Sequence, residues 1–189
     1  MSSGAVYQTG NAPLNSYAES KILIEQEGNR RASHGSFEFK IARCFAFLGP
    51  HQDLDSHFAA AQFFSQVIQG KAITIQGDGS PIRSYLYPTD FVVGVIQILL
   101  KGRSGQAYDL GSKEAVKIVD LAKLINECRP GEIPPVNVLH QGSKSLSQSN
   151  VYLPNLDLIE NELNFKPKVN LSEAVKRTSQ FYQECGLIK

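Results

Sequence analysis

The sequence carries almost no excess of either charge. Its 189 residues include 19 Lys and Arg and 18 Asp and Glu, which gives a formal net charge of +1 at pH 7. A surface that follows the phosphate backbone of a nucleic acid normally has a clear basic excess, so we expect no nucleic-acid partner. Cysteine is also scarce. Cys44, Cys128 and Cys185 form an odd and widely spaced set, which indicates reduced thiols in a cytoplasmic protein.

Long apolar segments are missing as well. The longest runs from Phe91 to Leu100 and has ten residues, whereas a helix that spans a bilayer needs about 20. The N-terminal segment MSSGAVYQTG lacks the basic start and apolar stretch of a secretory signal. We therefore expect no membrane partner. With 42% hydrophobic and 20% charged residues, the composition is that of an ordinary globular protein.

Helix-like and strand-like patterns alternate along the chain. Periodic or capped segments predict helices at about 16–32, 57–69, 90–100, 119–128, 156–163 and 171–185. Short apolar segments between turn residues predict strands at 37–47, 72–76, 83–87, 106–110 and 136–139. Asp90 stands at the start of the third helix, where its carboxylate is placed to cap free N–H groups. This alternation favours an α/β domain.

One pair of residues in the first helix suggests chemistry. Tyr17 and Lys21 are four residues apart in the segment YAESK, so both side chains point to one face. An ammonium group about 5–6 Å from a phenol lowers a pKa that starts near 10, which makes the tyrosine a proton acceptor near neutral pH. Taken alone, this spacing favours an ordinary solvated Tyr–Lys pair.

Further segments accompany this pair in a fixed order. SSGAVYQ precedes it, and ARCFAFLGP, GKAITIQGDGSPIRSYLYPTD, AYDLGS and LNFKPKVNLSEAVKRT follow it. Together these motifs resemble the extended short-chain dehydrogenase/reductase family, which contains the NAD-dependent nucleotide-sugar epimerases and dehydratases. The resemblance extends from Ser2 to nearly Lys189 and so covers almost the whole chain.

The resemblance implies an α/β fold with two parts. Residues 1–50 correspond to the end of an NAD(P)-binding Rossmann-type domain with its Tyr-x-x-x-Lys helix. Residues 51–189 correspond mainly to a small α/β subdomain that binds the nucleotide sugar, with some segments returning to the Rossmann sheet. The implied cofactor is NAD or NADP, the implied substrate is a UDP- or dTDP-hexose, and the implied assembly is a homodimer formed through the Tyr17 helix.

The resemblance also implies roles for individual residues. Ser3 would hydrogen-bond the sugar hydroxyl that is oxidised, Tyr17 would remove its proton, and Lys21 would hold the nicotinamide ribose. Phe45 and Phe47 match positions that pack against the nicotinamide end of the cofactor. Arg83 matches an arginine that pairs with the nucleotide diphosphate, for which a guanidinium fork is well shaped. The full set of implied substrate contacts is Ser3, Ala46, Gln62, Thr74, Ile75, Gln76, Arg83 and Lys144.

Three departures from the family pattern limit which of the family's substrates and reactions this chain is expected to handle. Ala46 replaces an asparagine that contacts substrate, and Val151 replaces a second diphosphate-binding arginine, for which Lys144 is a candidate substitute. Gly4 and Ala5 stand where family members that eliminate water carry an Asp-Glu pair. Since elimination needs an acid and a base whereas 4-epimerisation needs only Tyr17, a 4-epimerase is favoured over a dehydratase.

The family's Gly-x-x-Gly-x-x-Gly turn, which binds the cofactor pyrophosphate, is absent from the sequence. We therefore expect a chain truncated at its N-terminus, which by itself binds NAD poorly and turns over little substrate. Two alternatives stay open beside the epimerase and the dehydratase. One is a keto-sugar reductase of the same family that uses NADPH, and the other is a non-catalytic module that binds nucleotide sugars.

Two other features look chemical at first. The segment HQDLDSH offers His51, Asp53, Asp55 and His57 as metal ligands, but it lies in an expected loop and no second cluster completes a site. We therefore expect a polar loop over the substrate mouth and no metal. Cys44 lies in an apolar strand, where a core position is expected for it and not a nucleophile.

Overall fold

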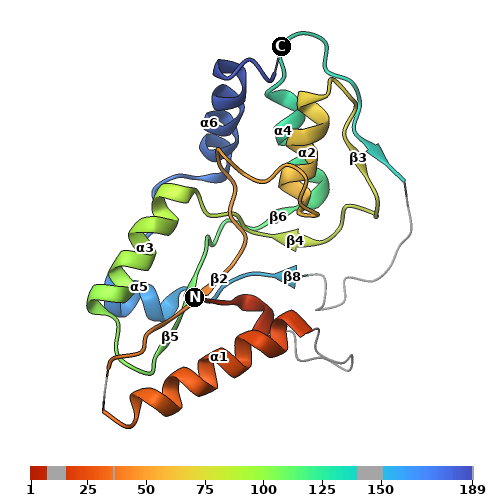
Figure 1. The fold of residues 1–189 in the computed structure, drawn as a ribbon. Helices are drawn as coiled ribbons and strands as arrows, with labels where there is room; N and C mark the ends of the chain where they lie inside the picture. Colours follow the sequence, from red (N-terminus) through yellow and green to blue (C-terminus); the bar gives the residue numbers. More distant parts are fainter. Residues whose placement is uncertain (8–15, 36, 140–150, 189) are drawn as a thin grey trace.

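The computed structural model describes residues 1–7, 16–35, 37–139 and 151–188. The elements follow one another as shown in Figure 1. Their bounds are β1 (Ser2–Ser3), the 3-10 helix η1 (Gly4–Tyr7), α1 (Ser16–Ala32), β2 (Ile41–Cys44), α2 (Ala59–Ile68), β3 (Thr74–Ile75), β4 (Ile82–Arg83), α3 (Pro88–Lys101), β5 (Ala107–Leu110), β6 (Val116–Lys117), α4 (Ile118–Glu127), β7 (Asn137–Val138), β8 (Val151–Tyr152), α5 (Asp157–Leu163) and α6 (Leu171–Glu184).

The strands form three small sheets. The first is wholly parallel and has the order β1-β2-β5. β3 pairs with β7 in parallel. The third sheet has the order β6-β4-β8, in which β4 runs antiparallel to β6 and parallel to β8. A parallel sheet combined with helices confirms the predicted α/β class.

Two hydrophobic clusters hold these layers together. In the first, α3 and α5 pack on β2 and β5, with Tyr108, Leu110 and Ile159 almost fully buried. Gly94 makes this packing possible, because a Cβ atom there would lie 2.3 Å from the Leu110 side chain. β5 is therefore a strand of the sheet that begins with β1, and α3 and α5 pack on this sheet, although all three elements belong to the later part of the chain.

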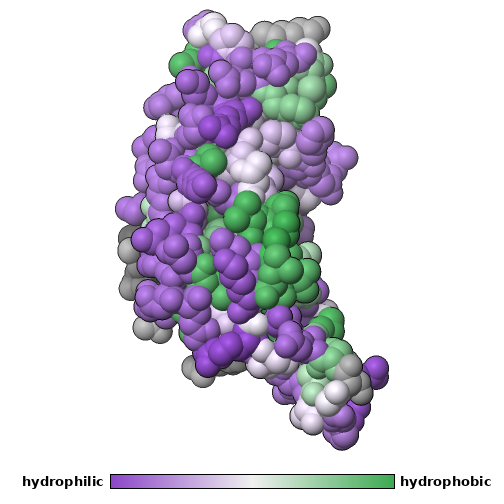
Figure 2. Space-filling view, turned by 90° about the vertical axis from the view of Figure 1, so that its left-hand side faces the viewer, coloured by the Kyte–Doolittle hydropathy of each residue, from purple (hydrophilic) through white to green (hydrophobic). Residues whose placement is uncertain are grey.

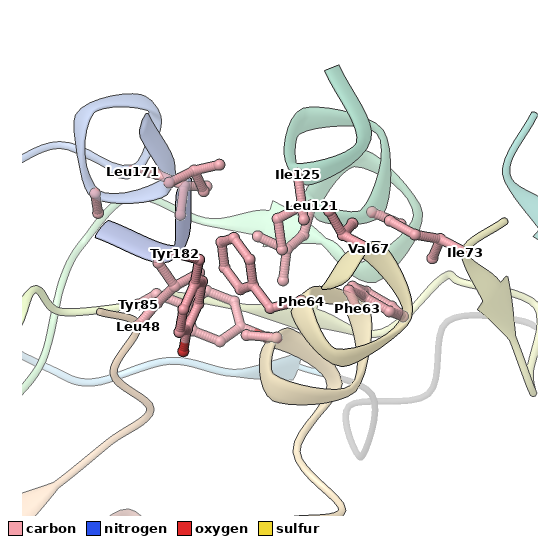
Figure 3. Packing of buried hydrophobic residues seen from close by; sticks show 14 of the residues in the cluster. Leu48, Phe63, Phe64, Val67, Ile73, Tyr85, Leu121, Ile125, Leu171 and Tyr182 are labelled. Carbon is pink, nitrogen blue, oxygen red and sulfur yellow. The ribbon is translucent and has the colours of Figure 1, made fainter. Parts of the chain in front are cut away.

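The second cluster lies where α2, α4 and α6 meet, at the top of Figure 1. Figure 3 shows its side chains pointing toward one another from these helices and from neighbouring extended segments. Phe64, Leu121, Ile125 and Val175 are fully buried in it. The two clusters accord with a division into two parts, but the boundary near residue 50 stays a prediction.

Several strands are shorter than the sequence predicts. β2 ends at Cys44, and beyond it only Phe47 pairs, in an isolated bridge with Leu86. β6 and β8 are not predicted, because β6 runs directly into α4 and β8 is followed two residues later by Pro154. The predicted role of Asp90 as a helix cap is wrong. Asp90 lies inside α3, and its buried carboxylate accepts the backbone N–H groups of Lys168 and Val169, both at 2.9 Å.

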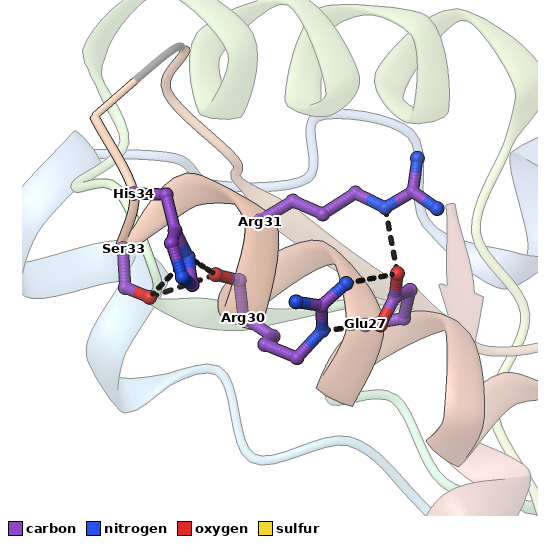
Figure 4. A network of polar contacts seen from close by, with 5 residues as sticks. All are labelled: Glu27, Arg30, Arg31, Ser33 and His34. Atoms are coloured by element: carbon purple, nitrogen blue, oxygen red, sulfur yellow. Dashed lines mark hydrogen bonds and ion pairs between the residues drawn. The ribbon is translucent and has the colours of Figure 1, made fainter.

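A polar network lies near the C-terminal end of α1 (Figure 4). The Glu27 carboxylate accepts hydrogen bonds from Arg30 Nε at 2.7 Å and from Arg31 Nε at 2.6 Å. His34 Nδ1 lies 2.7 Å from the Arg30 carbonyl oxygen, in the turn that follows the helix. The basic side chains stand where the partial negative charge of the helix end attracts them.

α3 leaves an apolar face in contact with solvent. Figure 2 shows a group of hydrophobic side chains on the side of the molecule where α3 lies in Figure 1. The large apolar side chains of α3 that are about half exposed or more are Val92, Val93, Ile96, Leu99 and Leu100. Contiguous exposed apolar surface of this kind is typical of interaction sites. Within the described ranges, no helix is both long and apolar enough to cross a membrane.

Two isoleucines of α3 allow the packing to be tested with matched substitutions. Ile98 is 3% exposed and Ile96 is 48% exposed. We expect Ile98→Ala to lower the free energy of unfolding by about 2–5 kcal/mol, because it leaves a cavity against β5. Ile96→Ala is expected to change it by at most about 0.5 kcal/mol. Urea unfolding of both variants measures this, and equal losses at the two positions would contradict the exposure described for α3.

The Glu27 network leads to a prediction on pH dependence. Hydrogen bonds from Arg30 and Arg31 lower the pKa of Glu27 from 4.5 to about 2. The ionised Glu27 carboxylate therefore stabilises the folded state. This contribution is fully present above pH 4.5 and is lost as the pH falls from there toward 2. In a carboxyl ¹³C NMR titration we expect Arg30→Gln to move the Glu27 midpoint back toward 4.5. Arg177→Gln, which affects an equivalent pair with Glu173 on α6, leaves it unchanged. A wild-type midpoint near 4.5 would refute the prediction.

Candidate functional site

Ser3 stands at the carboxyl end of β1, where the parallel sheet meets η1. Its side chain is buried, and its Oγ accepts the backbone N–H of Ala5 at 3.2 Å. This local bond turns the chain out of the strand immediately after Ser3. The hydroxyl is thereby held at an edge of the sheet where open α/β folds commonly bind ligands.

Tyr17 and Lys21 share one face of α1, as the four-residue spacing predicts. Tyr17 is 53% exposed, and Lys21 Nζ lies 5.4 Å from the centre of its ring. Burial raises the pKa of the Cys44 thiol at the end of β2, while the N-terminal ammonium and the Lys21 ammonium act in the opposite direction. The pair thus combines a solvent-accessible phenol with a cation beside its ring.

Tyr152 is a site residue that the sequence analysis did not assign. It ends β8, and its ring packs against Phe45 with the ring centres 4.7 Å apart. Burial raises the pKa of Tyr152, interaction with the Ser3 hydroxyl lowers it, and the neighbouring Tyr17 phenol raises it further. Tyr152 therefore lies among the predicted catalytic residues. The available signal was its position directly after Val151, which the resemblance had already marked as a site position.

Arg83 meets the same tyrosine from β4. Its guanidinium carbon lies 5.8 Å from the centre of the Tyr152 ring, and Nη1 donates to the carbonyl oxygen of Ile82 at 2.8 Å. The arginine is partly buried. Tyr152 thus has Arg83 of β4 on its ring and the Ser3 hydroxyl at the end of β1 as a second neighbour.

Phe45 fills the space beside Gly4. A Cβ atom added at Gly4 would lie 2.4 Å from Phe45 Cζ, which is closer than such contacts occur. Phe45 is itself 6% exposed and is held between this glycine and Tyr152. Position 4 therefore has no room for a side chain unless Phe45 moves.

Phe47 and Ala46 lie on the same segment after β2. The Phe47 ring packs against Phe91 of α3, with the ring centres 5.7 Å apart, and is 48% exposed. The Ala46 methyl packs on the cluster of α2, α4 and α6, and it offers no hydrogen bond in place of an asparagine. Contact of Phe45 or Phe47 with a nicotinamide stays a prediction.

The remaining predicted substrate contacts lie in the smaller part of the fold. Gln62 is exposed on α2, and Gln76 is exposed just after β3. Thr74 is partly buried, and its backbone N–H donates to Gln66 Oε1 at 2.7 Å. The Ile75 side chain belongs to the core, and its carbonyl oxygen accepts the backbone N–H of Leu139 at 3.1 Å beside the pairing of β3 with β7, so contact of Ile75 with a ligand stays a prediction. Lys144 lies outside the described residues.

The segment with His51, Asp53, Asp55 and His57 forms a loop between β2 and α2. Asp53 Oδ1 accepts the backbone N–H of Asp55 at 3.1 Å, and the His51 ring packs on Phe181 of α6 at 4.5 Å. Over the ranges that the structure describes, no three His, Cys, Asp or Glu side chains come close enough to hold a metal ion.

Comparison with known proteins gives this geometry a family. Residues 3–111 match the NAD dependent epimerase/dehydratase family. The match covers more than half of the chain, so the chain belongs to this family, as the motifs indicate. The chain is 29% identical over 176 residues to human dTDP-D-glucose 4,6-dehydratase, which is 91% of this chain and 49% of that protein. It is 27% identical over 161 residues to UDP-glucuronic acid decarboxylase 1 of Arabidopsis thaliana, which is 85% of this chain and 36% of that protein.

Solved structures share the fold. UDP-glucose 4-epimerase from Thermotoga maritima, solved with UDP-glucose, superposes with a TM-score of 0.81 at 23% identity, over 97% of this chain and 62% of the epimerase chain. dTDP-glucose 4,6-dehydratase from Bacillus anthracis, solved with NAD, gives a TM-score of 0.79 at 22% identity, over 97% and 60% of the two chains. The chain thus spans half or less of the length of these two curated relatives and about three-fifths of the solved chains.

The contact between Gly4 and Phe45 can be tested by substitution. We expect Gly4→Ala to lower the free energy of unfolding by about 1–3 kcal/mol, because the new methyl group overlaps the ring. Gly77→Ala is the control, since a Cβ atom there meets nothing within 4 Å. In a Phe45→Leu background the cost of Gly4→Ala is expected to shrink. An unchanged cost in that background, measured by urea unfolding, would show that Phe45 is not what excludes a side chain.

Proposed function

We propose that this chain carries the proton-transfer residues and the nucleotide-sugar surface of an NAD-dependent sugar-nucleotide 4-epimerase. The observation that carries the proposal is the half-exposed Tyr17 with Lys21 Nζ 5.4 Å from its ring, in a site that also includes the buried Ser3. A phenol, an ammonium and a hydroxyl are the groups needed to hold an alcohol and to move its proton. The membership of the chain in the epimerase/dehydratase family supports the same chemistry.

The donor set also fits a nicotinamide cofactor. The hydroxyl of Tyr17 and the ammonium of Lys21 are suited to the two hydroxyl groups of the nicotinamide ribose, and the Phe45 ring offers an apolar wall. When bound, NAD supplies the acceptor and donor of the hydride that leaves and returns to the sugar carbon. NADP is the alternative cofactor.

The chain's own residues then handle the proton and the position of the sugar. Ser3 Oγ holds the sugar C4 hydroxyl, and Tyr17 takes the hydroxyl proton as the C4–H bond gives up its hydride. Once the 4-keto sugar has turned over, Tyr17 would return the proton to the C4 oxygen. Lys21 Nζ lies 5.4 Å from the centre of the Tyr17 ring, and this cation–π contact helps to hold the phenol in place.

The surroundings of Gly4 favour an epimerase over a dehydratase. Eliminating water from the sugar requires a proton donor for the leaving oxygen and a base for the neighbouring carbon. Gly4 and Ala5 provide neither group, and the Phe45 ring occupies the space that a side chain at position 4 would need. A dehydratase would have to draw its acid and base from elsewhere in the site.

Arg83 and Tyr152 are proposed to bind the nucleotide sugar. A partly buried guanidinium suits a diphosphate, and the adjacent ring offers an apolar surface to the sugar or the base. The relatives and solved neighbours are named for UDP- and dTDP-linked sugars, which makes this the proposed substrate class. Gln62, Thr74, Ile75 and Gln76 remain proposed nucleotide contacts, and a homodimer through α1 remains a proposal too.

Two other candidate functions, a keto-sugar reductase and a non-catalytic module, would use the cofactor differently from an epimerase. A keto-sugar reductase would consume NADPH in proportion to substrate, whereas an epimerase recycles its own hydride. A non-catalytic module would bind the nucleotide sugar equally well with and without NAD, and would convert none of it.

The arginine of the site provides a direct test of this function. We expect calorimetry to detect binding of UDP-glucose or dTDP-glucose, and Arg83→Gln to weaken it about tenfold or more through loss of charge-assisted hydrogen bonds. Arg177 lies over the ring of Tyr87 at 5.7 Å, in the same way that Arg83 lies over Tyr152. Arg177→Gln is therefore the matched control and should leave the affinity unchanged.

Product analysis by NMR completes the test. An epimerase converts UDP-glucose into UDP-galactose in the presence of NAD. Since the chain by itself is expected to turn over little substrate, we expect a small conversion, which Tyr17→Phe abolishes without abolishing binding. Binding that ignores NAD and yields no product would replace the proposal with the non-catalytic module. Failure of both nucleotide sugars to bind would refute it outright.

A further inference from the structure

A continuous chain of polar groups connects the elements that carry the candidate site. Arg43 of β2 donates to both carboxylate oxygens of Glu25, from Nε at 3.0 Å and from Nη2 at 2.6 Å. Its Nη1 donates to the Tyr7 hydroxyl at 2.6 Å, and that hydroxyl donates to Asp109 Oδ1 at 2.9 Å. Asp109 Oδ2 accepts the backbone N–H of Asn155 at 3.0 Å.

The acids of this chain are buried. Glu25 is 8% exposed and Asp109 is 7% exposed, although an open cleft of about 620 Å³ reaches the network from solvent. Burial by itself raises the pKa of Glu25, but the hydrogen bonds from Arg43, the interaction with Ser2 and the charge of Arg43 together more than offset this and lower the pKa below its ordinary value. The pKa of Arg43 is raised, chiefly by its hydrogen bonds with Glu25. The two groups thus stay charged and paired.

Each end of the network lies close in sequence to a residue of the site. Glu25 follows Lys21 by four positions and Tyr17 by eight, so it lies about one and two helical turns farther along α1. Tyr7 follows Ser3 by four positions, at the end of η1. Asn155 follows Tyr152 by three positions. Arg43 itself precedes Phe45 by two residues.

We propose that Arg43 is a positioning residue of the site, which rests on the proposed function. It touches none of the reacting groups. Its guanidinium fixes where α1, η1 and the segment after β8 stand relative to β2, and thereby places Tyr17, Ser3 and Tyr152 with respect to one another.

The chemistry of the guanidinium explains why it can do this. A planar fork that meets both oxygens of a carboxylate permits one relative orientation, unlike the point charge of a lysine. If α1 or η1 slid along β2, a buried charge would be left without its partner, which is strongly unfavourable. The network therefore resists small shifts that apolar packing alone would tolerate.

The test follows the ring ¹H–¹³C NMR signals of Tyr17 and Tyr152 in the whole chain, assigned with Tyr17→Phe and Tyr152→Phe. Arg43→Gln is expected to move both signals by more than their linewidth in protein that is still folded, and Arg43→Lys to restore them in part. The matched control is Arg103→Gln. Arg103 donates to Glu162, which also accepts from the Tyr108 hydroxyl, so the same three groups occur away from the site. This control should move neither signal.

Two milder variants separate the branches of the network and keep the proposal testable if Arg43→Gln fails to fold. Tyr7→Phe removes one hydroxyl from a side chain that is 54% exposed, and so cuts the branch to Asp109 and Asn155. It is expected to move the Tyr152 signal and to leave Tyr17 in place. Glu25→Gln cuts the branch to α1 and is expected to do the reverse.

A merely structural role would give a different result. If Arg43→Gln lowers the melting temperature while both signals keep their positions, or if Tyr7→Phe moves neither signal, the proposal is overturned. These readouts need no turnover. A chain that binds no nucleotide sugar yet shows the expected shifts would therefore refute the proposed function and leave the positioning role of Arg43 standing.

Discussion

The partly buried ion pair between Arg43 and Glu25 is the contact on which the proposed arrangement of the site depends. It joins the central strand of the parallel sheet to the helix that carries Tyr17 and Lys21. Through Tyr7 and Asp109 the same guanidinium connects the first turn of the chain with the last strand of the sheet. Apolar packing forms the two hydrophobic clusters. Apolar contacts, however, do not fix the orientation of α1 and η1 relative to β2 as these directional hydrogen bonds do.

A second constraint is steric and lies at the junction of β1 and η1. The Phe45 ring occupies the space beside Gly4 and packs on Tyr152, so the residue after Ser3 must be a glycine as long as Phe45 stays. The packing of Phe45 therefore accounts for the lack of a side chain at position 4. It gives the proposed preference for epimerase chemistry a structural basis beyond the residue types alone.

Much of the fold follows from the sequence pattern. The helices α1, α2, α4 and α6 lie within a few residues of their predicted positions, because each presents a periodic apolar face or a recognisable end. Asn170, for example, caps α6 by accepting the N–H of Glu173 at 2.8 Å. The strands β6 and β8 could not be predicted, since one runs directly into α4 and the other ends shortly before Pro154, so that only their pairing with β4 defines them. Asp90 shows the same limit, because its partners lie 78 and 79 positions away.

The sequence by itself determined the alternation of helices and strands, the family, and the placement of Tyr17 and Lys21 on one helical face. All of these depend on local periodicity or on the order of motifs. Only the tertiary structure decided that Tyr152 lies beside Ser3, that Phe45 closes the space at Gly4, and that Tyr7 meets Asp109 across 102 positions. The physical reason is that helical spacing is set by bonds four residues apart, whereas these contacts depend on the path of the whole chain.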